Sequence, residues 1–264
     1  CKVINTLSGN DACVQFKDLF EENSTPWERS KVIANLLFTR DLAFSFGGTT
    51  VVSWNSKSAR NQENLLTREL FKSHPLLNHN NIIIFHDQFP DLTVEGGDVM
   101  PWNDYIFIGT YTADDYATHI TARTNKAAVE FISQLFSQKK IKSFELRKSK
   151  NARENALHLD CCFQPLGKGK AILHRKGFLV EDEYQWLVDF FGKENIFEIS
   201  ADEMYHMYSN VFSISPDVVV SERNFTRLNN WLRENGFTVE EIPYSEIAKQ
   251  EGLLRCSTLP LVRE

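Results

Sequence analysis

Four short fragments, far apart in this 264-residue chain, carry side chains that could act together on one carbon atom. They are residues 35–41 (NLLFTRD), 95–98 (EGGD), 158–160 (HLD) and 255–258 (RCST). Cysteine supplies a nucleophile, histidine transfers protons near neutral pH, and carboxylates hold a cation. This combination is suited to attack by a thiolate on a guanidinium carbon.

The third fragment extends an alternating pattern, Leu-His-Leu-Asp, over residues 157–160. Such alternation predicts a strand, on which His158 and Asp160 would project from the same face. A proton-transfer group would then lie beside a cation-binding carboxylate. Taken alone, the motif is explained as readily by a histidine and an aspartate on an exposed edge strand.

The second fragment places Glu95 and Asp98 on either side of two glycines. Paired glycines predict positive φ angles and close approach of the backbone, which would let an acid turn inward. A plain hairpin turn explains the glycines equally well. The apolar neighbours Val94 and Val99 indicate instead that this turn does not lie simply in water.

The first and last fragments each have a simpler explanation. Arg40 and Asp41 could form a surface ion pair, and Cys256 could be a small buried apolar residue. The polar neighbours Arg255 and Ser257 argue against a purely apolar setting for Cys256. A nearby positive charge would lower the pKa of its thiol, and a bound guanidinium could itself supply that charge.

The elements that must position these residues follow a repeating order. Helices are predicted over residues 61–74, 125–137, 181–192 and 224–236, the last ending in a glycine suited to a cap. Apolar strands follow them at 82–85, 141–146, 196–199 and 237–242, and further strands precede them at 49–54, 105–108, 171–174 and 218–220. We expect repeated β-β-α-β modules in a single α/β domain over residues 1–264. The alternative is a two-layer α/β protein without a repeat.

Composition excludes several functional classes. The net charge of −6 argues against nucleic acid as a partner, because phosphate binding needs a basic surface. No apolar run is long enough to span a membrane, and the N-terminus does not resemble a signal peptide. The odd count of five cysteines, with Cys161 and Cys162 adjacent, favours a reducing, cytoplasmic compartment. No Cys-x-x-Cys pair indicates a metal site.

In the order NxxFTRD, EGGDV, ARTN, HLD and RCST, the chain from residue 35 to 264 resembles the guanidine-modifying superfamily, the penteins. That superfamily includes arginine deiminase, dimethylarginine dimethylaminohydrolase and the glycine amidinotransferases, and the resemblance is greatest to arginine deiminase. It implies a five-bladed α/β propeller of ββαβ modules around a central polar site. The residues before Asn35 lack the expected opening strand, so we expect a trimmed or atypical first module.

The resemblance also implies roles for individual residues. Cys256 matches the nucleophile that forms a covalent thiouronium-type intermediate, His158 the general acid and base, and Glu95 its carboxylate partner. Asp41 and Asp160 match the pair that holds guanidinium nitrogens.

Four further residues have supporting roles in the match. Asn35, Arg60 and Arg123 are candidates for binding the substrate's α-amino and α-carboxylate end. Asp98 is expected to support the site without touching substrate. Dimethylarginine hydrolases resemble HLK where this chain has HLD, so Asp160 favours an unmethylated guanidinium or ureido substrate.

Together these features favour a cysteine-dependent hydrolase acting on arginine, citrulline or a related amino acid. The first alternative is an amidinotransferase, in which an acceptor amine replaces water. The second is a non-catalytic binding pentein, against which the joint presence of Cys256, His158 and Glu95 argues. The only partner expected is a small guanidino or ureido molecule, with no cofactor, metal, nucleic acid or membrane; a homo-oligomer stays open.

Overall fold

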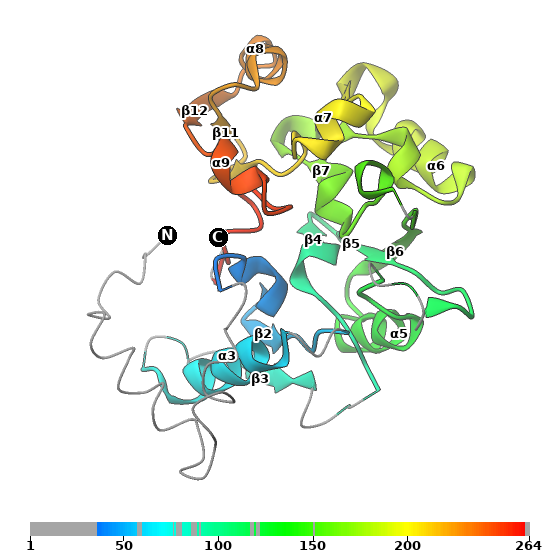
Figure 1. Ribbon diagram of the computed structural model, residues 1–264, viewed down its shortest axis with the longest axis vertical. Coiled ribbons are helices and arrows are strands. Elements are labelled where there is room, and N and C mark those ends of the chain that lie inside the picture. Colours follow the sequence, from blue (N-terminus) through cyan, green and yellow to red (C-terminus); the bar gives the residue numbers. More distant parts are fainter. Residues whose placement is uncertain are drawn as a thin grey trace.

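The computed structural model describes residues 36–56, 60–75, 77, 81–85, 89, 91–116, 119, 122–149 and 151–261. Asn35 and the expected atypical opening of the first module lie outside these residues. The described chain folds into four three-stranded sheets, which follow one another around a common centre (Figure 1).

Every sheet has the same internal order. The strands are β1 (Ala43–Phe46), β2 (Thr49–Val52) and β3 (Asn81–Ile84); β4 (Val99–Trp102), β5 (Tyr105–Thr110) and β6 (Lys140–Glu145); β7 (Phe163–Pro165), β8 (Ala171–Leu173) and β9 (Ile196–Glu198); β10 (Phe212–Ser213), β11 (Val218–Glu222) and β12 (Thr238–Ile242). The first two strands of each sheet pair antiparallel, and the second and third pair parallel. A parallel pair needs a crossover connection, and a helix supplies it.

The four crossover helices are α3 (Asn61–Ser73), α5 (Lys126–Leu135), α6 (Glu181–Phe191) and α8 (Thr226–Glu234). The predicted ββαβ modules are therefore confirmed, with helix boundaries close to those expected. The sequence pattern did not predict the first strand of each sheet. These strands are only two to four residues long, too short to show an alternation. The short helices α7 (Ala201–Tyr205) and α9 (Ser245–Ala248) were also not predicted.

Local sequence explains where these helices begin and end. The side chain of Asn125 accepts a hydrogen bond from the backbone of Ala128 and caps α5. Acidic residues fill the first turn of α6, where they oppose the positive end of the helix dipole. Gly192 and Gly236 follow α6 and α8 with φ of 80°, the left-handed conformation that ends a helix most easily with glycine.

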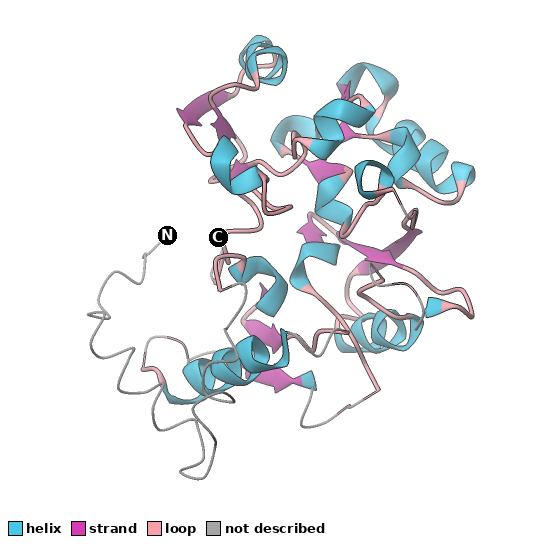
Figure 2. Ribbon diagram, viewed as in Figure 1, coloured by secondary structure: helices cyan, strands magenta, loops and turns pink. Residues whose placement is uncertain are grey.

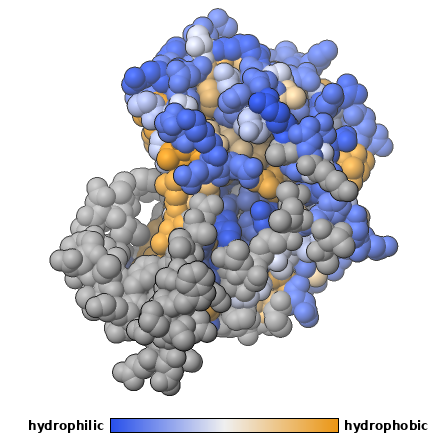
Figure 3. Space-filling model, in the orientation of Figure 1, coloured by the Kyte–Doolittle hydropathy of each residue, from blue (hydrophilic) through white to orange (hydrophobic). Residues whose placement is uncertain are grey.

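The crossover helices α5, α6 and α8 lie toward the periphery (Figure 1 and Figure 2). Buried apolar side chains form three clusters, the largest of which joins the second, third and fourth modules. Polar residues cover most of the described surface on the face shown in Figure 3. Within the described residues, none of the helices combines the length and apolar character needed to cross a bilayer.

The ring of modules closes where the C-terminal segment returns beside residues 39–42 (Figure 1). The backbone N–H of Arg40 donates to the carbonyl of Cys256 at 3.0 Å, and Arg40 Nε donates to the carbonyl of Arg255 at 3.2 Å. The first and last described parts of the chain are therefore hydrogen-bonded to each other at the centre of the ring.

Gly96 permits the close approach of two segments at this centre. A Cβ atom at position 96 would lie 2.1 Å from the carbonyl oxygen of Arg40, so no other residue fits without a backbone shift. We expect Gly96→Ala to lower the free energy of unfolding by about 2–3 kcal/mol, as overpacking does. Gly47→Ala is the control: a Cβ there meets nothing within 4 Å, and its φ of +55° should cost about 1 kcal/mol. Equal urea midpoints for the two variants would contradict this expectation.

Candidate active site

Three modules begin with a short 3-10 turn immediately before their first strand: η1 (Thr39–Leu42), η3 (Gly96–Asp98) and η6 (Leu159–Cys161). Asp41 lies in the first turn, Glu95 directly before the second, and Asp160 in the third. All three carboxylates are buried. Because equivalent positions of the modules face the centre of the ring, residues far apart in sequence meet there.

The prediction of a strand over residues 157–160 is wrong. His158 has an extended backbone, but Leu159 to Cys161 form the 3-10 turn η6. The reason lies in tertiary contacts: the Leu159 N–H donates to Asp98 Oδ1 at 2.9 Å instead of entering a sheet. His158 and Asp160 are nevertheless both buried at the site, so they do not lie on an exposed edge strand.

The interpretation of the glycine pair was correct in one respect and wrong in another. Neither Gly96 nor Gly97 has a positive φ, and the segment is a 3-10 turn, not a hairpin turn. Close approach was predicted correctly, because a Cβ at Gly97 would lie 2.8 Å from both Asp41 Oδ1 and His158 Cγ. The glycines allow the turn to pack directly against the site.

His158 lies between two carboxylates. Its Nε2 is 2.7 Å from Glu95 Oε2, and its Nδ1 is 3.7 Å from Asp41 Oδ1. Burial alone would lower the pKa of His158, but the charges of Asp41 and Glu95 and the hydrogen bond to Glu95 raise it to about 9. Burial likewise opposes ionisation of Glu95, yet the contact with His158 holds the Glu95 pKa below its usual range. The pair is therefore an imidazolium–carboxylate at neutral pH.

Asp160 is held by Arg255, the residue next to Cys256. Arg255 Nη1 donates to Asp160 Oδ2 at 2.6 Å, and Arg255 Nη2 donates to the Val99 carbonyl at 3.0 Å. The Cys256 thiol points to the same carboxylate oxygen, with Sγ 3.6 Å from Asp160 Oδ2. Burial raises the pKa of the Cys256 thiol well above its ordinary value, and the carboxylates of Asp160 and Asp41 raise it further.

Asp41 is held in the same way by a second arginine. Arg60 Nη1 donates to Asp41 Oδ2 at 2.7 Å, and Arg60 also pairs with Glu63 at 2.8 Å. The Arg60 pKa is raised: burial would lower it, but the surrounding carboxylates outweigh that effect. Arg40 and Asp41 thus do not form a surface ion pair. Both carboxylates predicted to bind a guanidinium already bind a guanidinium of this chain.

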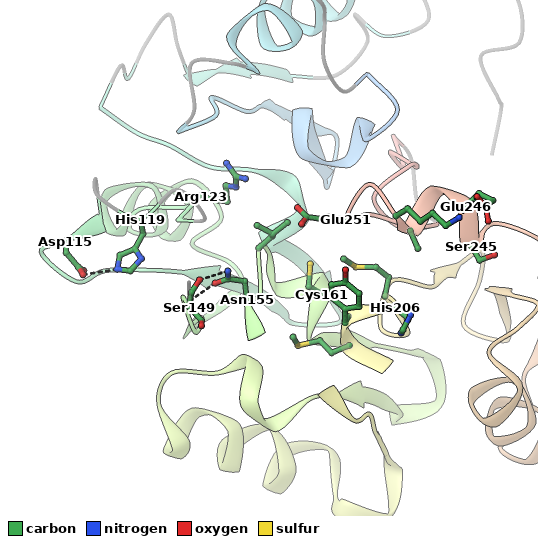
Figure 4. Close-up of a pocket in the computed structure, with 16 residues that line it drawn as sticks. Asp115, His119, Arg123, Ser149, Asn155, Cys161, His206, Ser245, Glu246 and Glu251 are labelled. Atoms are coloured by element: carbon green, nitrogen blue, oxygen red, sulfur yellow. Dashed lines mark hydrogen bonds and ion pairs between the residues drawn. The ribbon is translucent and has the colours of Figure 1, made fainter. Parts of the chain in front are cut away.

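A cavity of about 1180 Å³ lies beside these groups. Figure 4 shows Arg123 from the segment before α5, Cys161 from η6 and Glu251 from the C-terminal segment at its border. Arg123 Nε is 3.9 Å from Glu95 Oε2, so the cavity adjoins the His158–Glu95 pair. Cys256, His158 and Asp41 do not line this cavity.

Asp98 holds the backbone next to His158. Its Oδ1 accepts the Leu159 N–H, and its Oδ2 accepts the hydroxyl of Thr124 at 2.6 Å. Lys148 Nζ donates to the carbonyl of Ala156, two residues before His158, at 2.7 Å. Asp98 thus holds the backbone of the residue that follows His158, and its supporting role in the reaction stays a prediction.

The ligand atoms of Asp41, Glu95 and His158 lie within 4.8 Å of one another, close enough to share a metal ion. Arg60 already donates to Asp41 and stands 3.8 Å from Glu95 Oε2. A divalent cation would have to displace this guanidinium and the proton of His158. The donor set thus fits a planar organic cation better than a metal.

Three residues at the site were not predicted as participants: Arg255, Glu63 and Asn210. Asn210 lies just before β10, where the other modules carry their site residues, so the repeat itself could have indicated it. Glu63 follows Arg60 by three residues, the spacing of an ion pair within one helical turn, so the predicted helix could have indicated that pair. Arg255 adjoins Cys256, but its residue type does not indicate its contacts with Asp160 and Val99. Those contacts depend on how the segments fold together.

The chain matches the family model described as "Arginine deiminase" over residues 31–196 and 190–263. An arginine deiminase of Bacillus cereus is 29% identical over 268 aligned positions, covering 87% of this chain and 62% of the relative. YkgA of Bacillus subtilis, an uncharacterised protein, is 27% identical over 228 residues. The match covers 86% of this chain and 70% of YkgA. The chain thus spans less than two thirds of that arginine deiminase.

Solved structures share the fold. The N-terminal domain of ArgZ, an arginine dihydrolase from the ornithine–ammonia cycle in cyanobacteria, superposes with a TM-score of 0.70 at 20% identity, covering 85% of this chain and 74% of that one. A dimethylarginine dimethylaminohydrolase superposes with a TM-score of 0.64 at 21% identity, covering 85% and 78%. The expected α/β pentein fold is confirmed.

Asp98 provides a pH-dependent test of this geometry. Burial raises the Asp98 pKa to about 6, so the folded protein binds this proton more tightly than the unfolded chain. The contribution of this bound proton to the free energy of unfolding is fully present below about pH 4. It is lost as the pH rises through about 6. Asn at position 98 does not ionise. The unfolding free energy of the parent, relative to Asp98→Asn, should therefore fall by about 3 kcal/mol over that range.

The matched control is Asp217→Asn, whose carboxylate pairs with Lys168 at the surface. Urea unfolding at several pH values should give a constant difference between this control and the parent. A constant difference for Asp98→Asn as well would contradict the expected cost of ionising a buried carboxylate.

Proposed function

This chain belongs to the arginine deiminase family, and we propose that it is a cysteine-dependent hydrolase acting at the guanidinium or ureido carbon of arginine, citrulline or a related amino acid. One observation carries the proposal. The buried thiol of Cys256 lies near two carboxylates, Asp41 and Asp160, each of which binds a guanidinium group. The site is therefore suited to present a planar cation to a sulfur nucleophile.

Substrate binding begins as an exchange of one guanidinium for another. A carboxylate binds a guanidinium through two parallel hydrogen bonds, and the substrate offers the same donors as Arg60 and Arg255. Asp41 Oδ1 and Glu95 Oε1 accept no hydrogen bond from the part of the chain that the structure describes. These oxygens are available to additional donors of the substrate. Because the exchange preserves charge, the buried carboxylates are never left unpaired.

The bound substrate then activates the thiol. The pKa of Cys256 is raised by burial and by two carboxylates, so the thiol is protonated without substrate. A guanidinium held beside the sulfur opposes that effect and favours the thiolate, so the thiol proton is released to solvent as the substrate binds. The thiolate attacks the central carbon perpendicular to the guanidinium plane, and binding holds the two atoms close.

His158 manages the protons of both half-reactions. It is protonated at neutral pH, so it first donates a proton to the departing amine, and the covalent thiouronium intermediate remains. The neutral imidazole then accepts a proton from water, which attacks the same carbon and releases Cys256. Glu95 holds the ring in place through the 2.7 Å contact.

Arg123 is suited to bind the α-carboxylate of the substrate. It borders the large cavity next to Glu95, where the amino-acid end of an extended guanidino compound would lie. Asn35, outside the described residues, is proposed for the same end of the substrate. Arg60 is proposed for this end of the substrate as well, once the substrate guanidinium has displaced it from Asp41.

Related proteins support this chemistry. Structures of ArgZ include a cysteine-to-serine variant bound to substrate and another variant covalently bound to a reaction intermediate. A dimethylarginine dimethylaminohydrolase variant forms an adduct with S-methyl-L-thiocitrulline.

The deciding experiment incubates the protein separately with arginine, citrulline and methylated arginines, and measures ammonia, citrulline and ornithine. Arginine should yield ammonia with citrulline, or ammonia with ornithine if both nitrogens are removed. Addition of glycine tests an amidinotransferase, whose product would be an amidinated amine without ammonia. A folded protein that forms no product from any of these compounds would contradict the proposed function.

Replacement of the nucleophile tests the covalent step. We expect Cys256→Ser to lower turnover at least about 1000-fold while substrate binding survives, because serine lacks an accessible anionic form at neutral pH. Calorimetry measures binding and product formation measures turnover. Cys162→Ser is the control, since Cys162 is buried and donates to the carbonyl of Leu159 instead of facing Asp160. Turnover by Cys256→Ser at the parent rate would rule out the covalent mechanism.

A further inference from the structure

Asn210 is fully buried next to the nucleophile. Its Oδ1 accepts the backbone N–H groups of Leu253 at 3.1 Å and Cys256 at 3.0 Å. An amide nitrogen cannot accept those hydrogen bonds, so the two backbone donors determine which end of the amide is oxygen. The Nδ2 group must then face the other way, where it donates to Cys256 Sγ at 3.1 Å.

The same residue connects the nucleophile to Asp160. Its backbone carbonyl accepts the Arg255 N–H at 3.1 Å, and its Nδ2 lies 3.5 Å from the carbonyl of Asp160. The neighbouring Ser209 hydroxyl donates to that carbonyl at 2.8 Å. Residues 209 and 210 therefore determine the distance between the sulfur and the carboxylate that faces it.

The charges around the sulfur explain why this contact matters. Asp160, Asp41 and Cys161 disfavour a negative charge on Cys256, and Arg255 favours one. If the substrate displaces the Arg255 guanidinium from Asp160, part of that favourable effect is lost. Among the described residues, Asn210 contributes the hydrogen bond that the sulfur accepts, and it does not compete with substrate for a carboxylate.

We propose that Asn210 is a catalytic residue that donates a hydrogen bond to the Cys256 thiolate as it forms. The inference rests on the proposed function, because it takes Cys256 as the nucleophile. A hydrogen bond to an ion is about twice as strong as one between neutral groups, so the contact strengthens as the thiol loses its proton. It thus stabilises the reactive form of the cysteine more than the resting form.

Asn210→Asp removes this donor but also adds a negative charge beside the sulfur, so Asn210→Ala, which removes the donor without adding charge, is measured with it. The aspartate side chain keeps an oxygen for the Leu253 and Cys256 N–H groups but presents a second oxygen to the sulfur. We expect kcat for the active guanidino or ureido compound to fall about 100-fold, the effect of removing one donor to a developing negative charge, with a smaller change in KM. Acidic pH should restore part of the activity, because a protonated carboxyl can donate again.

A second measurement needs no turnover. The rate at which iodoacetamide alkylates Cys256, followed by peptide mass spectrometry, reports the pH at which the thiolate forms. The midpoint should shift upward by at least about one pH unit in Asn210→Asp, as expected for loss of a charge-assisted donor. Asn229→Asp is the control, because Asn229 is equally buried but donates to the carbonyl of Glu222 at 3.0 Å, away from the sulfur.

The two measurements separate failure of the inference from failure of the proposed function. An unchanged alkylation midpoint in folded Asn210→Asp overturns the role of Asn210, whatever the parent hydrolyses. A midpoint shifted upward in both Asn210→Asp and Asn210→Ala supports the contact with the thiolate even if no guanidino compound is a substrate, whereas a shift in Asn210→Asp alone is the effect of the added charge and overturns that role. If Asn210→Asp does not fold, the alkylation midpoint of Asn210→Ala decides by itself, with the same two outcomes.

Discussion

Buried carboxylates must be neutralised, and this requirement governs the centre of the molecule. Asp41, Glu95 and Asp160 lie away from solvent, where an unpaired charge would be costly. Each is held by a cation of the same chain, namely Arg60, His158 and Arg255. Loss of one partner from a buried pair typically costs about 3–5 kcal/mol. Because Glu95 and His158 come from neighbouring modules, and Arg255 follows the last module, two of these three pairs also join distant parts of the ring.

The same constraint relates the resting site to the proposed reaction. A carboxylate that holds an arginine side chain has the geometry to hold a substrate guanidinium, so the resting structure resembles the bound state in charge and shape. The acids that bind the cation also keep the Cys256 thiol protonated until the cation of the substrate arrives. Meanwhile the imidazolium of His158 is maintained by Asp41 and Glu95. Substrate binding and nucleophile activation would thus depend on the same carboxylates.

Repetition of the module explains how a site can be assembled from distant fragments. Asp41, Asp98, Asp160 and Asn210 each lie in the turn that precedes the first strand of a module. Glycine makes the contacts possible where two turns meet, since a Cβ at Gly97 would lie within 3 Å of Asp41 and His158 side-chain atoms. These turn positions are equivalent in the modules, but their side chains differ. The repeated module therefore brings carboxylate and amide groups to the same centre.

Much of this protein was predictable from sequence alone. Apolar periodicity indicated helices such as α5, glycine marked the end of α8, and the repeated order of elements predicted the ββαβ modules. The residue types of Cys256, His158, Glu95 and Asp41, and the resemblance of the fragments that carry them to guanidine-modifying enzymes, indicated a site. Tertiary structure decided the rest. Residues 157–160 alternate like a strand but form a turn, since Asp98 captures the Leu159 N–H. The pairing of Arg255 with Asp160, and the contact of Asn210 with the sulfur, arise only when distant modules meet. Such contacts depend on which distant segments meet, and local sequence does not carry that information.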